Sequence, residues 1–324
     1  MRALVVNEYG PPESMTIEEM DDPVAADDQV LIDVAAAGIN FADVLSIAGK
    51  YQVKTPTPFV SGSEAAGIVS AVGKDVTRFS VGDKVLVATR GGAFAEKAVA
   101  AEKSTTLLPD GLNFEQGAGF SVTYGTSYHA LKQSADLQPG ETVLVLGAAG
   151  GVGITAVEIA KALGARVIAA ASSDEKLEFA KSAGADELIN YTTTPLKETV
   201  KEMTGGDGVD VVYDPVGGEY TDQAFRATAW HGRYLVIGFA DGEIPKFAAN
   251  IALLKEASII GVWWGTWAAK NPELQTQNVA EISALIAEGK LTPRVTDSYP
   301  LVDYVEAFNA ITERRARGKV VLRM

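Results

Sequence analysis

The sequence contains no cysteine and only two histidines, His129 and His231. Without cysteine the chain can form neither a disulfide nor a cysteine-ligated metal site. The two histidines lie in different settings, with no His-x-x-x-His spacing and no nearby pair of carboxylates to complete a ligand set. We therefore expect no catalytic zinc and no other bound metal.

Basic residues and long apolar runs are also scarce. The chain has 28 Lys and Arg against 42 Asp and Glu, a formal net charge of −14. Clustered basic residues bind phosphate backbones, so we expect no nucleic-acid partner. No apolar run reaches membrane-spanning length and the N-terminal segment lacks a signal-like core, so we expect a cytoplasmic protein with no membrane contact. At 324 residues and 47% hydrophobic content, the chain is long enough for two globular domains.

The most informative motif joins a buried-strand pattern to a glycine-rich turn and a helical pattern. Gly147 allows a tight turn, Gly150 and Gly151 let the backbone approach a pyrophosphate, and Gly153 lets the helix pack closely. The helix N-terminus then offers N–H groups to the phosphates. The motif is Gly147-Ala-Ala-Gly150-Gly151-Val152-Gly153, between a strand at 143–146 and a helix at 154–163. It predicts a dinucleotide-binding turn, whereas a glycine turn alone would fit a purely structural role equally well.

Strand and helix patterns alternate after this motif, which favours a parallel sheet covered by helices. The predicted strands are 166–171, 187–190, 209–214, 233–238 and 258–262, and the helices between them include 174–183, 195–204 and 218–228. This context favours a Rossmann unit over a bare structural turn.

The first 120 residues instead show short β-like runs separated by turns. Near the end of the chain, a helix at 303–315 and a strand at 319–322 have no obvious partner in the predicted parallel sheet. We expect them to return to the first module. The predicted domains are therefore 1–122 with 264–324, and 123–263.

Several motifs, in order along nearly the whole chain, resemble those of the zinc-independent (zeta-crystallin-like) quinone oxidoreductases of the medium-chain dehydrogenase/reductase superfamily. The resemblance implies a Rossmann doubly wound parallel sheet plus a discontinuous, β-rich GroES-like domain. The motifs are Gly38-Ile-Asn40-Phe41-Ala-Asp43, Gly62-Ser63-Glu64-Ala-Ala-Gly67, Val81-Gly82-Asp83-Lys84-Val85, Ala148-Ala-Gly-Gly-Val-Gly153 and Asp214-Pro-Val216-Gly217-Gly218.

The end of the second Rossmann strand indicates which dinucleotide binds. NAD-selective domains place an acid there to accept hydrogen bonds from the ribose 2′-OH. Here the strand ends in alanines followed by Ser172 and Ser173, with Lys176 nearby, which favours the 2′-phosphate of NADPH. The alternative is that the serines only cap the next helix and Lys176 is solvated. The resemblance adds Tyr191 and Arg314 as adenosine-phosphate contacts.

The resemblance also suggests how hydride transfer proceeds. Zinc-dependent relatives carry Gly-His-Glu, whereas this chain has Gly62-Ser63-Glu64, and metal-free hydride transfer suits a quinone or enone acceptor. Asn40 and Tyr51 are the candidates to bind the acceptor oxygen; without the resemblance, they would be interpreted as a turn residue and a partly buried aromatic. Near the nicotinamide, the resemblance implies Thr126, Gly238 and Phe239.

Two other functions remain open: a 2-enoyl-thioester reductase of the acryloyl-CoA type, and a low-turnover NADPH-binding protein with a structural or RNA-binding role. We also expect a homo-oligomer, dimer or tetramer. The strand at 258–262, followed by Trp263 and Trp264, would otherwise leave an apolar sheet edge in water.

Overall fold

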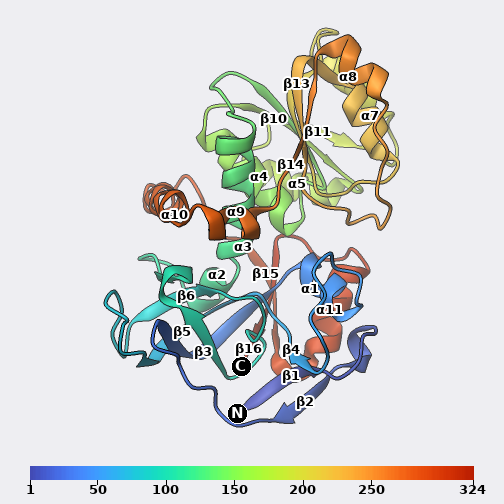
Figure 1. The fold of residues 1–324 in the computed structure, drawn as a ribbon. Helices are drawn as coiled ribbons and strands as arrows, with labels where there is room; N and C mark the ends of the chain where they lie inside the picture. Colours follow the sequence, from blue (N-terminus) through green and yellow to red (C-terminus); the bar gives the residue numbers. More distant parts are fainter. The chain divides into compact units, whose positions relative to one another are not determined.

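The computed structural model describes all 324 residues and divides into two compact units. The first unit combines Met1–Val122 with Pro293–Met324, and the second is Thr123–Thr292. Strands dominate the first unit, whereas the second alternates strands and helices (Figure 1). None of the helices combines the length and the apolar character that crossing a bilayer requires.

The first unit contains a seven-stranded sheet and a three-stranded sheet. The order of the larger sheet is β15-β16-β3-β5-β6-β8, with β7 also paired to β3, and that of the smaller is β2-β1-β4. The elements are β1 (Arg2–Val6), β2 (Thr16–Glu19), β3 (Gln29–Ile39), α1 (Phe41–Ile47), β4 (Phe59–Val60), β5 (Glu64–Val72), β6 (Lys84–Ala88), β7 (Lys97–Ala101), β8 (Thr105–Leu107), α2 (Phe114–Ala118), β15 (Val295–Pro300), α11 (Tyr304–Thr312) and β16 (Lys319–Arg323).

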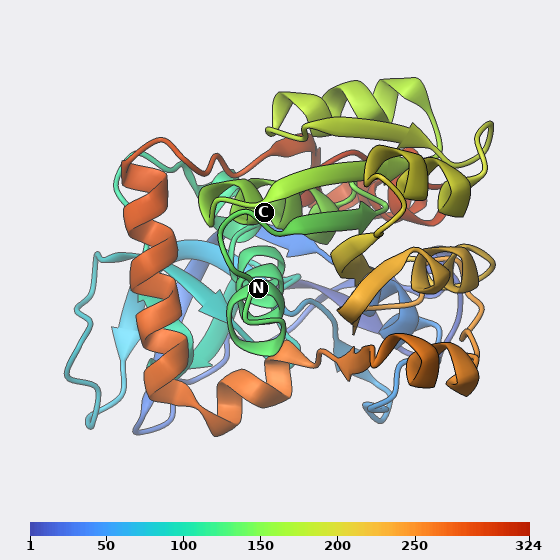
Figure 2. The ribbon, with the colours of Figure 1, turned by 90° about the horizontal axis from the view of Figure 1, so that it is seen from above.

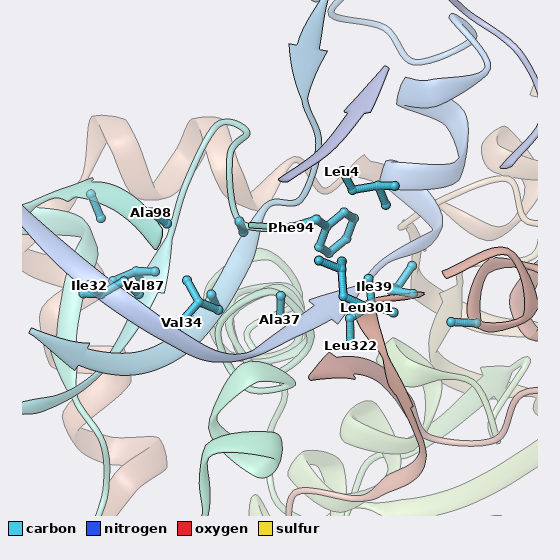
Figure 3. Close-up of a cluster of buried hydrophobic side chains, with 14 of the residues drawn as sticks. Leu4, Ile32, Val34, Ala37, Ile39, Val87, Phe94, Ala98, Leu301 and Leu322 are labelled. Atoms are coloured by element: carbon cyan, nitrogen blue, oxygen red, sulfur yellow. The ribbon is translucent and has the colours of Figure 1, made fainter. Parts of the chain in front are cut away.

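The core of the first unit is shared by its two chain segments. Alternate side chains of β3, such as Ile32 and Val34, point into this core, which Figure 3 shows together with Leu322 of β16. The rings of Phe94 and Phe308 meet edge to face, with centroids 5.9 Å apart. Because β16 pairs antiparallel with β3, the predicted return of the last strand to the first module is confirmed.

The second unit is built on a six-stranded parallel sheet of order β11-β10-β9-β12-β13-β14. The order reverses beside β9, as in doubly wound dinucleotide folds, so the predicted Rossmann sheet is confirmed. Its elements are α3 (Ser121–Tyr128, beginning in the first unit), a π-helix (His129–Ser134), β9 (Thr142–Leu146), α4 (Gly151–Ala162), β10 (Arg166–Ala171), α5 (Asp174–Ser182), β11 (Glu187–Asn190), α6 (Leu196–Met203), β12 (Val209–Asp214), α7 (Tyr220–Arg226), β13 (Thr228–Val236), α8 (Ala249–Lys255), β14 (Ser258–Gly261), α9 (Trp264–Lys270) and α10 (Pro272–Ala287).

Helices α9 and α10 belong to the second unit, although the predicted boundary assigned everything after residue 263 to the first. The two helices follow each other directly in the chain (Figure 2). Asn271 separates them, and Pro272 opens α10. Trp267 stacks on His129 at 4.0 Å, and Tyr128 donates a hydrogen bond to Glu281 at 2.5 Å. These contacts attach both helices to the α3 region, so the chain returns to the first unit only at Pro293.

Candidate functional site

Three loops meet at the carboxyl end of the parallel sheet, following the neighbouring strands β9, β12 and β13. The turn after β9 lies against the loop after β12, since a Cβ added at Gly147 would be 2.9 Å from Val216 Cγ2. The loops after β12 and β13 are joined by backbone hydrogen bonds from Ala240 to Pro215 (3.0 Å) and from Asp241 to Val216 (2.8 Å). In this fold, ligands bind at this edge, beside the point where the strand order reverses.

The glycine turn has the geometry that its spacing predicts. Gly147 has φ +56°, and its carbonyl accepts a hydrogen bond from Gly150 N–H at 2.9 Å. A Cβ on Gly153 would lie 2.2 Å from Gly147 O, so the close approach of α4 to the turn requires glycine there. A Cβ added at Gly150 would meet nothing closer than 3.4 Å. The protein's own packing therefore explains Gly153 but leaves Gly150 unexplained.

The buried carboxylate of Asp214 holds the loop after β12 in place. It accepts hydrogen bonds from Val216 N–H (2.8 Å), Gly217 N–H (2.9 Å), Thr221 Oγ1 (3.0 Å) and the Tyr234 hydroxyl (2.5 Å). Four charge-assisted bonds fix this loop firmly. Desolvation, followed by the charge of Asp214, raises the pKa of Tyr234 far above its usual range.

Two of the predicted nicotinamide contacts, Gly238 and Phe239, follow β13, in the loop that is hydrogen-bonded to the loop after β12. Gly238 N–H donates to the Asp214 carbonyl at 3.3 Å, and a Cβ on Gly217 would lie 3.2 Å from the Phe239 ring. The third, Thr126, is a half-buried residue inside α3. Its neighbour Ser127 donates to the Val152 carbonyl at 3.0 Å, which ties α3 to the glycine turn.

The predicted phosphate-binding residues of the second unit lie together beyond β10 and β11. Lys176 Nζ donates to Ser172 Oγ at 3.2 Å, and Ser173 Oγ accepts from Lys176 N–H at 3.4 Å. Tyr191 joins them because β10 and β11 are neighbours, and its N–H donates to the Ala171 carbonyl at 3.2 Å. Arg314 belongs to the first unit, where it follows α11 with φ +59°.

In the first unit, Asn40 lies in a buried network at one edge of the larger sheet, where β3 ends and its two neighbours, β5 and β16, begin. Asn40 follows β3, Glu64 begins β5 and Lys319 begins β16. Lys319 Nζ donates to Asn40 Oδ1 and to Glu64 Oε1, both at 2.6 Å, and Asn40 Nδ2 donates to Glu64 Oε1 at 2.9 Å. Val122 N–H donates to the other oxygen of Glu64 at 2.9 Å.

The other predicted acceptor-binding residue, Tyr51, lies beyond the opposite end of α1 from Asn40. Its side chain is half-buried, and its backbone N–H donates to the Leu45 carbonyl at 3.1 Å. The structure thus places Asn40 directly before one seven-residue helix and Tyr51 four residues after its last residue. No hydrogen bond joins the two side chains.

Comparison with known proteins finds one family model within each of the two units. Residues 26–110 match the alcohol dehydrogenase GroES-like domain, and residues 151–283 match the zinc-binding dehydrogenase family model. A "Quinone oxidoreductase-like protein 2 homolog" of Nematostella vectensis is 41% identical over 99% of this chain and 88% of that protein. The chain belongs to the quinone oxidoreductase family of the medium-chain dehydrogenases/reductases.

Two solved structures extend this family assignment. Escherichia coli quinone oxidoreductase complexed with NADPH has a TM-score of 0.93 and 30% identity, with 100% of both chains covered. The CurK enoyl reductase has a TM-score of 0.91 and 29% identity, covering 100% of this chain and 99% of that one. The predicted fold class, Rossmann plus GroES-like, is thereby confirmed for this quinone oxidoreductase family member.

This family member forms no cluster of three or more His, Cys, Asp or Glu side chains arranged to hold a metal ion. Where zinc-dependent relatives have histidine in Gly-His-Glu, Ser63 instead lies between Asn40 of the buried network and Asp43 of α1. Ser63 Oγ is 3.3 Å from Asn40 Nδ2 and 3.5 Å from Asp43 Oδ2. The side chains present therefore hydrogen-bond to one another.

Several residues near these sites were not identified from the sequence. Asn190 donates to Asp174 at 2.8 Å, so the carboxylate next to Ser173 has a fixed partner. Thr192 donates to the Ser172 carbonyl at 3.4 Å, and the ring of Tyr220 lies 4.2 Å from that of Tyr191. Adjacency of β10 and β11 could have pointed to Asn190 and Thr192. Strand adjacency could not have pointed to Tyr220, because this residue follows β12, and β12 is not a neighbour of β11.

Asp43 makes the stability of the first unit depend on pH. Burial raises its pKa from 3.8 to about 6, against the opposing effects of the Asn40 N–H and the Lys319 charge. Between those two values the folded state binds more protons than the unfolded state, so stability falls as the pH rises. Relative to Asp43→Asn, the wild-type free energy of unfolding should fall by about 3 kcal/mol across this window. Urea unfolding of both proteins from pH 4 to 7 measures this; parallel pH curves would contradict it.

Proposed function

We propose that this protein is a metal-free, NADPH-dependent oxidoreductase that transfers hydride to a quinone or an enone, in the cytoplasm. The observation that carries the proposal is the grouping of Ser172, Ser173, Lys176 and Tyr191 beyond β10 and β11, with no carboxylate at the tip of β10. Hydroxyls and an ammonium suit a 2′-phosphate, whereas an acid would repel it. The NADPH complex of the similar Escherichia coli enzyme is consistent with this choice.

Each part of the cofactor has candidate partners in this chain. The N–H groups at the start of α4 suit the pyrophosphate, because no side chain caps that helix end. The loop held by Asp214 would support the nicotinamide together with α3. The proposed cofactor contacts are Gly150, Gly151 and Val152 for the pyrophosphate, Ser172, Ser173, Lys176, Tyr191 and Arg314 for the adenosine phosphate, and Thr126, Gly238 and Phe239 for the nicotinamide.

Bound NADPH would supply the hydride, and the acceptor would leave as a hydroquinone or saturated ketone after taking up one proton from solvent. The protein's task is then to orient the acceptor and stabilise the negative charge that develops on its oxygen. We assign this role to the Asn40 amide and the Tyr51 hydroxyl. Both are hydrogen-bond donors near the ends of α1.

Steady-state NADPH oxidation tests the proposal. Purified protein should oxidise NADPH with 1,4-naphthoquinone or an alkenone, and NADH should be a much poorer donor. Tight NADPH binding without turnover on any acceptor would instead support a role as a binding protein. A preference for NADH would refute the assignment of Ser172, Ser173 and Lys176.

A second candidate is the reduction of 2-enoyl thioesters, which the similarity to the CurK enoyl reductase favours. Crotonyl-CoA belongs in the same assay for this reason. A kcat/KM for crotonyl-CoA above that for every quinone and enone would make the thioester the preferred acceptor. The net charge of −14 argues against it, because the CoA phosphates are anionic.

We also propose that the protein self-associates through the outer edge of β14. This strand ends the parallel sheet, and α8, which directly precedes it in the chain, exposes Leu253 and Leu254, which are 77% and 67% exposed in the single chain. An unpaired strand edge next to an apolar surface favours pairing with a second copy.

Ile259→Asp should therefore lower the molar mass measured by light scattering after size-exclusion chromatography. Ile259 is 41% exposed on β14, so the charge would oppose association with little effect on the fold. Val81→Asp, on an exposed turn of the first unit, is the matched control and should keep the wild-type mass. Equal masses for all three proteins would rule out this edge.

A further inference from the structure

We propose that Lys319 and Glu64 are positioning residues that fix the Asn40 amide with its N–H group toward the acceptor oxygen. This inference rests on the proposed function, and it adds two residues that the acceptor would not touch. It starts from the unusual burial of the pair: the side chains of Lys319 and Glu64 are 6% and 1% exposed.

The charges of this pair determine which way the amide points. Lys319 can only donate hydrogen bonds and an ionised Glu64 can only accept them. With Asn40 Oδ1 at Lys319 and Nδ2 at Glu64, both contacts are attractive. Rotating the amide by 180° would place its NH2 against an ammonium and its oxygen against a carboxylate. Only one orientation of Asn40 is therefore compatible with the network.

The fold leaves space for Lys319 by placing two glycines beside its stem. A Cβ on Gly38 would lie 2.7 Å from Lys319 Cε and 3.0 Å from Glu64 Oε1, and a Cβ on Gly119 would lie 2.7 Å from Lys319 Cγ. The same Cβ on Gly38 would lie 2.2 Å from the Ala118 carbonyl oxygen. Elements from three parts of the chain thus form a slot that fits a linear side chain.

One hydrogen of the Asn40 amide remains weakly held. The first is bound to Glu64 at 2.9 Å, whereas the other contacts of Nδ2, to Ser63 Oγ and the Gly38 carbonyl, are 3.3 and 3.4 Å long. The ammonium on Oδ1 polarises the amide, which strengthens the N–H as a donor to a developing oxyanion. A buried ion pair is not required for stability, since apolar pairs often serve as well. Its effect on the amide gives this pair a role in the reaction.

A set of neutral variants tests whether the pair acts through Asn40. Removing one charge would leave the other buried and unpaired, so the test uses the double change Glu64→Gln with Lys319→Met. It should lower kcat with 1,4-naphthoquinone about 10-fold, a loss of about 1.4 kcal/mol, while the Kd for NADPH stays unchanged. Asn40→Ala should lose at least as much. In the Asn40→Ala background, the double change should have no further effect on kcat.

The outcomes separate this inference from the proposed function. Additive losses, or wild-type kcat in the double variant, would overturn the positioning role even if quinone reduction is confirmed. Wild-type kcat in Asn40→Ala would remove Asn40 from acceptor binding and overturn the inference too. Absence of quinone reduction by the unmodified protein would refute the proposed function instead.

A measurement on the unmodified protein covers the case in which the double variant does not fold. With asparagine labelled with 15N, the Asn40 side-chain NH2 signal, assigned by its loss in Asn40→Ala, should shift when 1,4-naphthoquinone is added to the NADP⁺-bound protein. No hydride is available in that complex, so the quinone persists. An unmoved signal at saturating quinone would overturn the inference.

Discussion

Gly150→Ala should weaken NADPH binding about 30-fold, a loss of about 2 kcal/mol, while the unfolding temperature stays near that of wild type. The residue is the N-cap that precedes α4, with φ −76° and ψ 171°, a conformation that alanine adopts readily. Its added methyl group would meet nothing in the protein closer than 3.4 Å. Under the proposed function it would meet the pyrophosphate of NADPH, because dinucleotides bind with the pyrophosphate against the backbone of such a turn. Fluorescence titration with NADPH and thermal unfolding measure the two quantities.

Gly153→Ala is the matched variant, because it adds the same methyl group to the same turn. At this position the Cβ would lie 2.2 Å from the Gly147 carbonyl oxygen, so the helix or the turn must move. We expect a loss of about 2 kcal/mol or more in the free energy of unfolding. Equal effects of the two changes on stability would show that Gly150 serves the fold and not a ligand.

Ser172→Asp should reverse the choice of cofactor. It places an acid beyond β10, where NAD-selective domains carry one, and beside the Lys176 ammonium 3.2 Å from the serine hydroxyl. The acid would repel a 2′-phosphate and accept hydrogen bonds from a ribose 2′-OH. It would also form an ion pair with the Lys176 ammonium, whose charge would then no longer attract the phosphate. The ratio of kcat/KM for NADPH to that for NADH should fall about 1000-fold, which corresponds to about 4 kcal/mol.

The control for this change is Ser182→Asp, at the other end of α5. It alters the net charge equally but lies a full helix away, so it should leave the cofactor ratio unchanged. A retained preference for NADPH in Ser172→Asp would mean that the phosphate binds elsewhere. Equal loss in both variants would point to a general electrostatic effect.

The second unit could be predicted well because its determinants are local. β10, β11 and β12 begin and end at the predicted residues, since each is a short apolar run bounded by turn residues. The chain from 114 to 132 forms α2, α3 and the start of a π-helix, not one continuous helix. Gly119 ends α2 where the chain packs against Lys319, a contact that no local pattern records.

The candidate acceptor site could be predicted only in part, because its network joins distant positions. Asn40 was found through its motif, but Lys319 lies 279 residues further along the chain and looks like any strand-flanking lysine. Its role follows only from the pairing of β16 with β3. Likewise, α9 and α10 have ordinary helical patterns, and only their contacts with Tyr128 and His129 assign them to the second unit.

The division of the first unit into two chain segments also orders events during synthesis. The second unit, Thr123–Thr292, is complete before any of Pro293–Met324 has been made. Until then Glu64 lacks its ammonium partner, and the core around Phe94 lacks Phe308 and Leu322. A nascent chain can therefore form its dinucleotide-binding sheet first. The first unit can close around Asn40 only after β16 has left the ribosome.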